Sequence, residues 1–161
     1  MKVTNLMDYT KIQCDIIKEY EKNGKTAPKY FFGTYKTWDG TTWTGIAIEG
    51  HVAVFIPDCM YYLDNNKVFY NCTPCDFNKM VNSDEYHRIT MTNDLINSDG
   101  KYINVLKDDD SIEYFVNSKF IEIFTKTGVN INYTGKTPKT PILVYSGNDL
   151  IGLICPINYT R

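Results

Sequence analysis

The stretch AIEGHVAVFIPD, residues 47–58, consists of two apolar runs separated by Gly50 and His51. A glycine between two strand-like runs is typical of a tight corner, because glycine accepts backbone angles that other residues avoid. A histidine in such a place could also be a general base or a metal ligand. The use of residues 50 and 51 therefore decides between a structural corner and a catalytic centre.

A catalytic His51 would need a hydrogen-bonding partner, and the nearest candidate in the sequence is Glu49. On one strand the two side chains would share a face, but Gly50 between them allows a bend or bulge that upsets this geometry. We therefore expect a structural corner here, and the sequence predicts a non-enzymatic protein with no catalytic residue, metal site or cofactor.

Length and composition indicate one globular domain over residues 1–161. The chain is long enough for one core and too short for two ordinary domains, and it is 43% hydrophobic and 14% aromatic. The formal charge of −2 provides no overall attraction to nucleic acid or to an anionic membrane. An apolar run long enough to span a membrane and the apolar region of a signal peptide are both missing, so we expect a cytoplasmic protein without membrane contact.

Residue periodicity divides the chain into two halves, about 1–57 and about 99–159. In the first half it predicts a helix from Asp8 to Asn23, ended by Gly24, and strands within 29–38, 42–50 and 51–57. In the second half it predicts strands at 100–106 and 111–117, a helix at 117–128, and strands at 129–135, 140–146 and 149–157. The middle is less regular, with a strand expected at 66–71, a short helix at 76–86 and a strand at 87–93.

The two halves share an element order if residues 2–5 begin the first half as a strand. Each half then has one strand, a helix and three strands. Two such βαβββ units would make an α+β domain with two helices on one face of antiparallel sheets.

Two segments carry a resemblance to a known family. Ala47, Gly50 and His51 match the motif A-T-D-G-H-R-L-A, in which Val52 here replaces the arginine. The closing segments are Asn117 to Ile121, TPIL at 140–143 and LICPI at 153–157. Together they resemble the bacterial-type DNA sliding clamps, whose domains are duplicated βαβββ units. This resemblance implies a DNA-clamp-like domain, although a clamp subunit of this type has three such domains and this chain has room for one.

The resemblance implies a role in DNA replication or repair, and a stand-alone domain of this type would suit a phage or another mobile element. Homo-oligomers would close head to tail around double-stranded DNA, with helix lysines touching phosphates without reading bases. The DNA-facing residues would be Lys11, Lys18, Lys22, Lys25, Lys119 and Lys126. An ordinary solvated face, with Asp15 and Glu122 as ion-pair partners, explains the same lysines.

The resemblance also implies a pocket for linear peptides of replication proteins along the last strand. Its wall would be formed by Leu153, Cys155, Pro156 and Ile157. The same four residues could simply be core and edge-strand residues. A related alternative is a module that mimics a clamp domain and inhibits a host partner.

Cys72 and Cys75 form a C-x-x-C pair, which favours a second class of function, a thiol-disulfide oxidoreductase. Together with Cys59 and His87, the pair would supply the four ligands that a zinc site needs, but the spacing of these residues fits no zinc pattern. With five cysteines and no export signal, reduced and inert thiols are the simplest interpretation.

Overall fold

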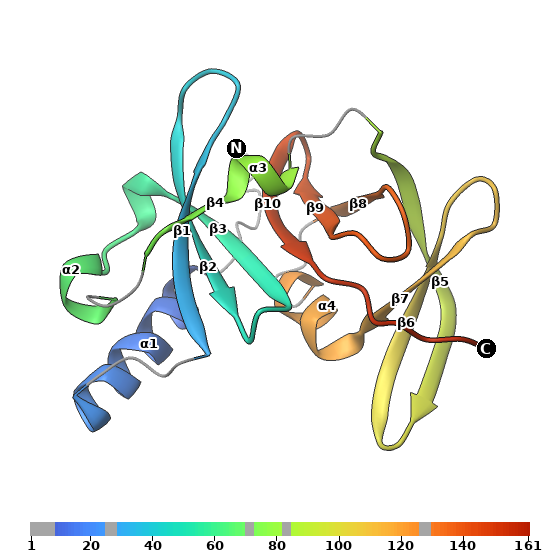
Figure 1. The fold of residues 1–161 in the computed structure, drawn as a ribbon, viewed down its shortest axis with the longest axis horizontal. Coiled ribbons are helices and arrows are strands. Elements are labelled where there is room, and N and C mark those ends of the chain that lie inside the picture. The colour runs from blue at the N-terminus through green and yellow to red at the C-terminus, as the bar shows by residue number, and fades with distance from the viewer. Residues whose placement is uncertain (1–8, 25–28, 70–72, 82–84, 126–129) are drawn as a thin grey trace. The chain divides into compact units, whose positions relative to one another are not determined.

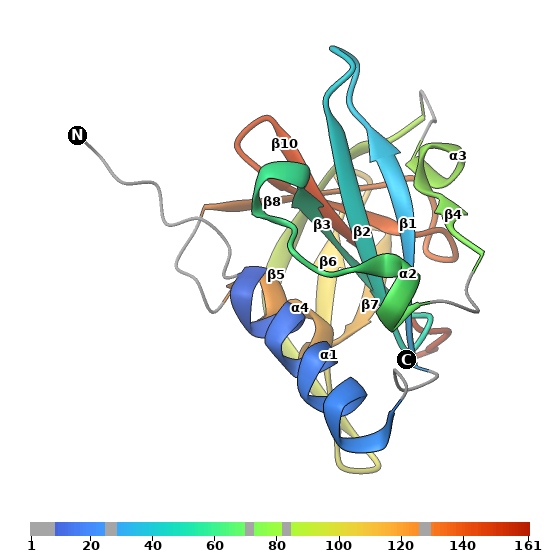
Figure 2. The ribbon, with the colours of Figure 1, turned by 90° about the vertical axis from the view of Figure 1, so that its left-hand side faces the viewer.

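The computed structural model describes residues 9–24, 29–69, 73–81, 85–125 and 130–161. The chain forms two compact units, an N-terminal unit of residues 8–82 and a C-terminal unit that contains residues 83–161. Figures 1 and 2 show that each unit combines helices with its own strands, so the expected α+β class is confirmed. The boundary lies within the segment 58–98 that separates the two predicted halves.

The N-terminal unit contains a three-stranded antiparallel meander with a short fourth strand at its edge. Its elements are α1 (Tyr9–Asn23), β1 (Tyr30–Lys36), β2 (Thr42–Ile48), β3 (Val52–Pro57), η1 (Asp58–Met60), α2 (Asn65–Val68), β4 (Cys75–Asp76) and α3 (Phe77–Val81). The strands lie in the order β4-β1-β2-β3. Because β4 is parallel to β1, the expectation of purely antiparallel sheets is wrong.

The predicted helix and strands of this unit are confirmed in α1, β1, β2, β3 and α3, whereas the strand expected at 66–71 is wrong for residues 66–68. Those residues belong to α2, because the Asp64 side chain accepts a hydrogen bond from the Asn66 amide and caps a helical turn. The predicted strand at 2–5 and the first residue of the predicted helix, Asp8, lie outside the described residues.

Helix α1 buries one face through residues spaced four and three apart, namely Tyr9, Gln13 and Ile16. Its end follows from Gly24, whose φ is +70° and whose amide donates to the Tyr20 carbonyl at 2.8 Å. This left-handed glycine is a common helix stop, as the sequence predicted.

The corner at Gly50 and His51 is a tight hairpin turn between β2 and β3. Glu49 and Gly50 both have positive φ, at 57° and 72°, and the His51 amide donates to the Ile48 carbonyl at 3.2 Å. These are the features of a type I′ turn, whose twist suits adjacent antiparallel strands. The structural interpretation of residues 50 and 51 is confirmed, and His51 is exposed in the turn.

Replacing Glu49 with asparagine should raise the free energy of unfolding by about 0.5–1 kcal/mol. Glutamate is strained at positive φ, whereas asparagine tolerates it. Urea denaturation of both proteins measures the difference. Asp99→Asn is a suitable control, because Asp99 occupies the same kind of position before Gly100 and should change little. A lower stability of E49N would contradict the expectation.

A pair of glycines in the N-terminal sheet makes room for an aromatic ring. Gly33 of β1 and Gly45 of β2 are direct cross-strand partners, and the Phe77 ring lies against both. Phe77 is 1% exposed and meets Phe55 edge-on at 5.2 Å between ring centroids. The start of α3 is therefore packed on the sheet through one ring that needs the bare backbone of two strands.

In the described part of the C-terminal unit, six strands lie in the order β10-β9-β8-β5-β6-β7, with every neighbouring pair antiparallel. Its elements are β5 (His87–Ser98), β6 (Lys101–Lys107), β7 (Glu113–Asn117), α4 (Ser118–Thr125), β8 (Ile131–Gly135), β9 (Ile142–Ser146) and β10 (Asp149–Ile154). The first residues of β5 pair with β8 and the later ones with β6, with a register shift between Met91 and Leu95.

All elements predicted for the C-terminal half are present. The order β7-α4-β8-β9-β10 is the predicted strand, helix and three strands. Asn117 begins the helix, as its side-chain oxygen accepts a hydrogen bond from the Lys119 amide at 3.0 Å. The clamp fold itself, and the placement of two helices on one face, stay predictions.

Candidate functional site

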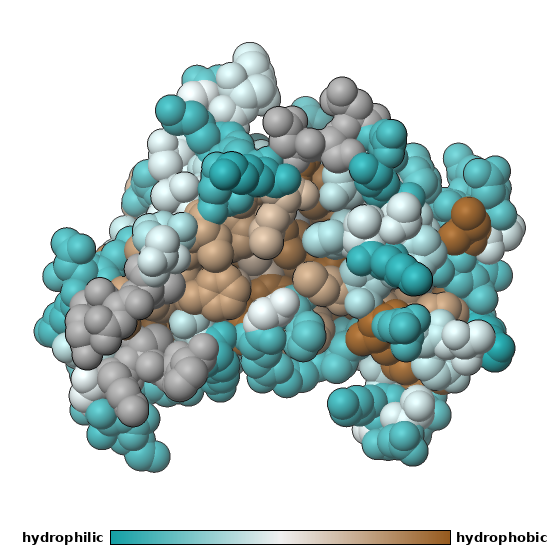
Figure 3. Space-filling model, viewed as in Figure 1, coloured by the Kyte–Doolittle hydropathy of each residue, from teal (hydrophilic) through white to brown (hydrophobic). Residues whose placement is uncertain are grey.

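One face of the β5–β6–β7 part of the C-terminal unit is apolar. Ile103, Val105 and Phe115 are buried there, and Ile96 packs against them. Their positions follow from strand pairing, since Val105 is opposite Phe115 and Ile103 is opposite Ile96. We call these four residues the sheet-face cluster. Figure 3 shows hydrophobic atoms interrupting the hydrophilic surface on the right, over this part of the unit.

Residues 155–161 form a segment that packs on the sheet-face cluster through Ile157 and Tyr159. They follow β10 and contain no helix or strand. The Ile157 amide donates to the Phe115 carbonyl at 2.8 Å, and the Tyr159 ring meets the Phe115 ring edge-on at 5.1 Å between centroids. Figures 1 and 2 agree that this segment ends beside β5, β6 and β7. Its side chains complete the packing of this face.

Arg161 ends the segment between two carboxylates of the sheet. One guanidinium nitrogen, Nη2, lies 2.8 Å from Oδ2 of Asp94 and 3.0 Å from Oε2 of Glu113. The hydrogen bond from Arg161 and its positive charge lower the pKa of Asp94. The segment is thus held by apolar contacts at one end and by charge at the other.

The opposite face of the same strands is covered by α4. Asn104, which alternates with Ile103 and Val105 along β6, is hydrogen-bonded to Ser118 at the start of that helix. The helix buries Phe120, Ile121 and Phe124. The two faces of β6 and β7 therefore have different covers, a helix on one side and an extended segment on the other.

His87, Asp108 and Tyr114 form a polar cluster elsewhere in this unit. Nε2 of His87 lies 3.1 Å from Oδ2 of Asp108 and 3.3 Å from the Tyr114 hydroxyl. The Asp108 side chain is 3% exposed, and its other oxygen accepts the amides of Asp110 and Ile112, both at 2.9 Å. Asp108 therefore fixes both the following turn and the orientation of the histidine ring.

The ionisation of Asp108 follows from these bonds. Burial by itself would raise the pKa of its carboxyl group, but the hydrogen bonds from the Ile112 amide, His87 and the Asp110 amide outweigh burial and lower this pKa. Burial, together with the Asp108 charge, raises the pKa of Tyr114. The carboxylate accepts, so Nε2 of His87 carries the hydrogen in this pair.

Asp108→Asn should destabilise the protein at pH 7, and the loss should shrink in acid. Because the pKa of Asp108 is lowered on folding, its charged form stabilises the fold above the unfolded-state pKa of about 4. This contribution disappears as the pH falls through the folded-state value. Urea midpoints of the wild type and D108N at pH 7 and pH 3 test this expectation, and a difference independent of pH would contradict it.

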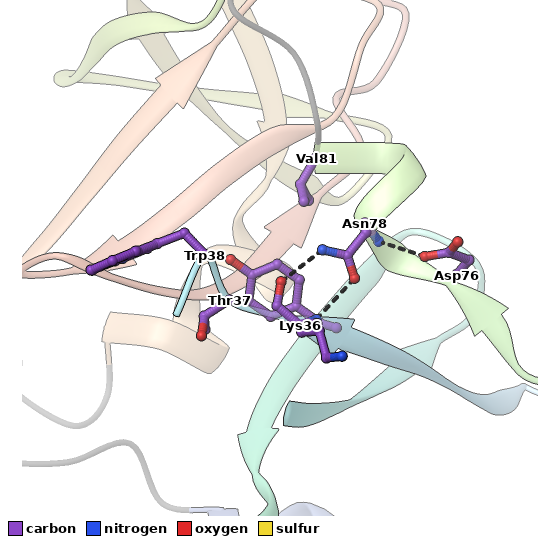
Figure 4. Close-up of a pocket in the computed structure, with 7 residues that line it drawn as sticks. Lys36, Thr37, Trp38, Asp76, Asn78 and Val81 are labelled. Carbon is purple, nitrogen blue, oxygen red and sulfur yellow. Dashed lines mark hydrogen bonds between the residues drawn. The ribbon is translucent and has the colours of Figure 1, made fainter. Parts of the chain in front are cut away.

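A hollow of about 550 Å³ lies beside the β1–β2 hairpin of the N-terminal unit (Figure 4). Its lining residues are Tyr35, Lys36, Thr37, Trp38, Asp76, Asn78 and Val81. The Asn78 amide group is used within the fold, since it accepts from the Lys36 amide at 2.9 Å and donates to the Lys36 carbonyl at 2.7 Å. Figure 4 shows Trp38 extending away from Asn78. The hollow therefore offers few polar groups that are not already engaged.

Trp38 is 99% exposed at the tip of this hairpin. Backbone hydrogen bonds hold the tip. The Thr37 amide donates to the Thr41 carbonyl at 2.8 Å, and the Gly40 amide donates to the Thr37 carbonyl at 3.0 Å. Sequence reasoning did not single out this tryptophan. Its place just before the Asp39–Gly40 turn signal indicates exposure.

The predicted DNA-facing lysines that are described are all exposed, namely Lys11, Lys18, Lys22 and Lys119. On α1 they lie opposite the buried face, but Lys11 is paired with Asp15 at 3.6 Å. The helix contains three lysines and three acidic residues, so its charges balance. Lys119 lies with its Nζ 5.5 Å from the Phe120 ring centroid. Lys25 and Lys126 lie outside the described residues.

The four residues predicted to form a peptide pocket have different environments. Leu153 is buried in β10 opposite Leu143, Cys155 and Pro156 are half-buried, and Ile157 lies on the sheet-face cluster. Burial raises the pKa of the Cys155 thiol. The sequence pointed to this region but not to the strand residues beneath Ile157, because their alternation indicates only that one face of the strands is apolar.

Only one cysteine of the C-x-x-C pair lies within the described residues. Cys75 lies in β4, whereas Cys72 is outside the described residues. Cys59 is exposed in η1, within the N-terminal unit, and His87 begins β5 of the other unit. In the described part of the chain, His, Cys, Asp and Glu nowhere gather in a group of three or more that could hold a metal ion.

Comparison with known proteins adds no relative. No family model matches the chain, and no curated protein or solved structure matches it significantly. Within the described residues, every helix is too short or too polar to cross a membrane.

Proposed function

We propose that the chain is a non-enzymatic, clamp-like binding protein whose sheet-face cluster holds an extended segment of a partner protein in DNA replication or repair. The clamp-like part rests on the motif around Gly50 and His51 and on the βαβββ order of the C-terminal half. The binding part rests on one observation, namely that an extended segment already lies on β5–β6–β7.

This face suits an extended peptide for two reasons. Strand β7 lies at the edge of the strand order in its unit, next to β6. The carbonyl of its central residue, Phe115, points outward and accepts an amide hydrogen. Beside this acceptor the sheet-face cluster offers apolar contacts. Recognition of this kind combines main-chain hydrogen bonds, which supply affinity, with contacts for alternate side chains, which supply specificity.

Peptides selected from a random phage-displayed library on the full chain test this proposal. Affinity of a selected peptide, measured by fluorescence anisotropy, should fall at least tenfold in Ile96→Glu, because the carboxylate would be placed on the apolar face. Leu95→Glu is the matched control, because Leu95 is the adjacent residue, points to the other face and is already 56% exposed. Circular dichroism confirms folding of both variants. Failure to select any peptide, or equal losses in both variants, would contradict the proposal.

A ring around double-stranded DNA is a second candidate, favoured by the exposure of Lys11, Lys18 and Lys22 opposite the buried face of α1. The balanced charge of the helix makes it the weaker one. It predicts an oligomeric mass by light scattering and retention on duplex DNA that weakens with salt and is reduced in Lys18→Ala/Lys22→Ala. A strict monomer without salt-dependent retention would contradict it.

A further inference from the structure

We infer that residues 157–161 are a built-in competitor for the peptide site, and that the partner's segment has the same pattern, an apolar, an aromatic and a basic residue at alternate positions. This inference rests on the proposed function and adds to it the chemistry of the partner and a means of regulation. The partner is an extended peptide segment, not a folded surface.

The alternation along the segment carries the first step. Ile157 and Tyr159 are half-buried on the sheet-face cluster, and Arg161 reaches its two carboxylates, whereas Asn158 and Thr160 between them are exposed. An extended chain turns successive side chains to opposite sides, so one side of this segment faces the sheet at every second residue. The segment thus contacts the sheet through every second side chain, as an extended peptide ligand would.

The sheet offers a distinct contact for each of the three positions. The first is apolar, formed by Ile103, Val105 and Phe115. The second is aromatic, because the Phe115 ring receives a second ring edge-on, at an interplanar angle of 61°. The third is anionic, formed by Asp94 and Glu113. Lys107 lies 3.9 Å from Glu113, so this carboxylate is shared with a neighbouring cation.

The attachment of the segment is suited to exchange. Among the described residues, its main chain is joined to the sheet by the backbone hydrogen bond from Ile157 to Phe115. Arg161 is 43% exposed, and its carboxylate partners Asp94 and Glu113 are 54% and 27% exposed. Water and salt screen ion pairs at such exposure, so the pair with Asp94 in particular contributes little. Covalent tethering compensates, since a short tether gives an effective concentration of about millimolar. A free peptide must therefore compete with the tethered segment.

Weakening the segment in the full chain should open the site. The probe is a fluorescein-labelled synthetic peptide of residues 156–161. Ile157→Ala/Tyr159→Ala removes the apolar and the aromatic side chain that face the sheet, and Asn158→Ala/Thr160→Ala is the matched control at the outward positions. The first variant should bind the probe at least tenfold more tightly than the wild type and the control. Equal affinities, or no binding by the first variant, would overturn the inference.

The anionic position provides an independent test. In the weakened variant, Asp94→Lys/Glu113→Lys should reverse the charge preference, so that a probe with Arg161→Glu binds more tightly than the original probe. Both positions are at the edge of the site, and circular dichroism checks that the fold is kept. An unchanged preference would overturn the assignment of the basic position.

The outcomes separate this inference from the proposed function. If library-selected peptides bind the wild type and the weakened variant equally, the proposed function stands and the competitor is refuted. If no peptide is selected and the probe does not bind, the proposed function fails as well. Light scattering could also show a dimer that is lost in Ile157→Ala/Tyr159→Ala. The occupant would then be the same segment of a second copy of this chain, and the inference of a separate partner protein would be overturned.

Discussion

Gly45→Ala is expected to lower the free energy of unfolding by about 3 kcal/mol or more. A Cβ at this position would lie 2.4 Å and 2.7 Å from two ring carbons of Phe77 and 3.0 Å from the Phe55 ring. Both rings are almost completely buried, so neither can move away without disturbing the sheet. Overpacking of a close-packed core costs about 1–3 kcal/mol and more when several groups must shift. Urea denaturation measures the loss.

A second substitution identifies the cause. Phe77→Leu in the G45A background should recover part of the stability, because the smaller side chain leaves room for the added methyl group, and a double-mutant cycle gives the coupling between the two positions. Gly33→Ala should not be rescued in this way, since its Cβ would also meet the Cys75 carbonyl oxygen at 2.5 Å. If G45A and F77L were simply additive, the ring contact would not be the reason.

Gln13→Leu should cost about 2–3 kcal/mol of stability. Gln13 is 0% exposed on α1, and its amide group donates to the carbonyls of Tyr9 and Met60 at 3.1 and 3.0 Å and accepts the Tyr62 amide at 2.9 Å. Leucine keeps the volume but leaves the Met60 and Tyr62 backbone groups without this partner. Urea denaturation measures the loss, and faster hydrogen exchange of the Tyr62 amide locates it.

Lys18→Leu is the control for this helix, because Lys18 is exposed on the opposite face of α1 and the substitution should change stability by about 0.5 kcal/mol or less. A Gln13→Leu protein of wild-type stability with a protected Tyr62 amide would show that residues 60–62 are held by other contacts.

Local signals in the sequence were sufficient for most elements. Ile16 and its neighbours at helical spacing predicted α1, Gly24 predicted its end, and the Gly50–His51 corner predicted the hairpin that follows β2. These predictions succeed because turn and helix-end conformations depend on a few adjacent residues. The error at 66–68 has the same origin, since the apolar residues there are typical of a strand, whereas the adjacent Asp64 caps a helical turn.

The candidate site was predicted only in part. Ile157 was expected to form the wall of a pocket, and in the structure it packs against residues of β6 and β7 that precede it by some forty positions or more. The contact of Arg161 with Asp94 and Glu113 was not predicted, because single charged residues far apart in a sequence do not reveal that they meet. The pattern of alternate residues at 157, 159 and 161 was visible but is too short to distinguish a ligand-like segment from a strand.

Residues 47–58 and the periodic runs around them were enough to establish an α+β chain with a corner at Gly50, because these features depend on neighbours along the chain. Pairings between distant residues were decided only in the folded protein. They place β4 parallel to β1, seat the Phe77 ring on Gly33 and Gly45, and bring residues 157–161 to β5, β6 and β7. Such contacts depend on which faces remain uncovered after the strands have paired, and that information is spread over the whole chain.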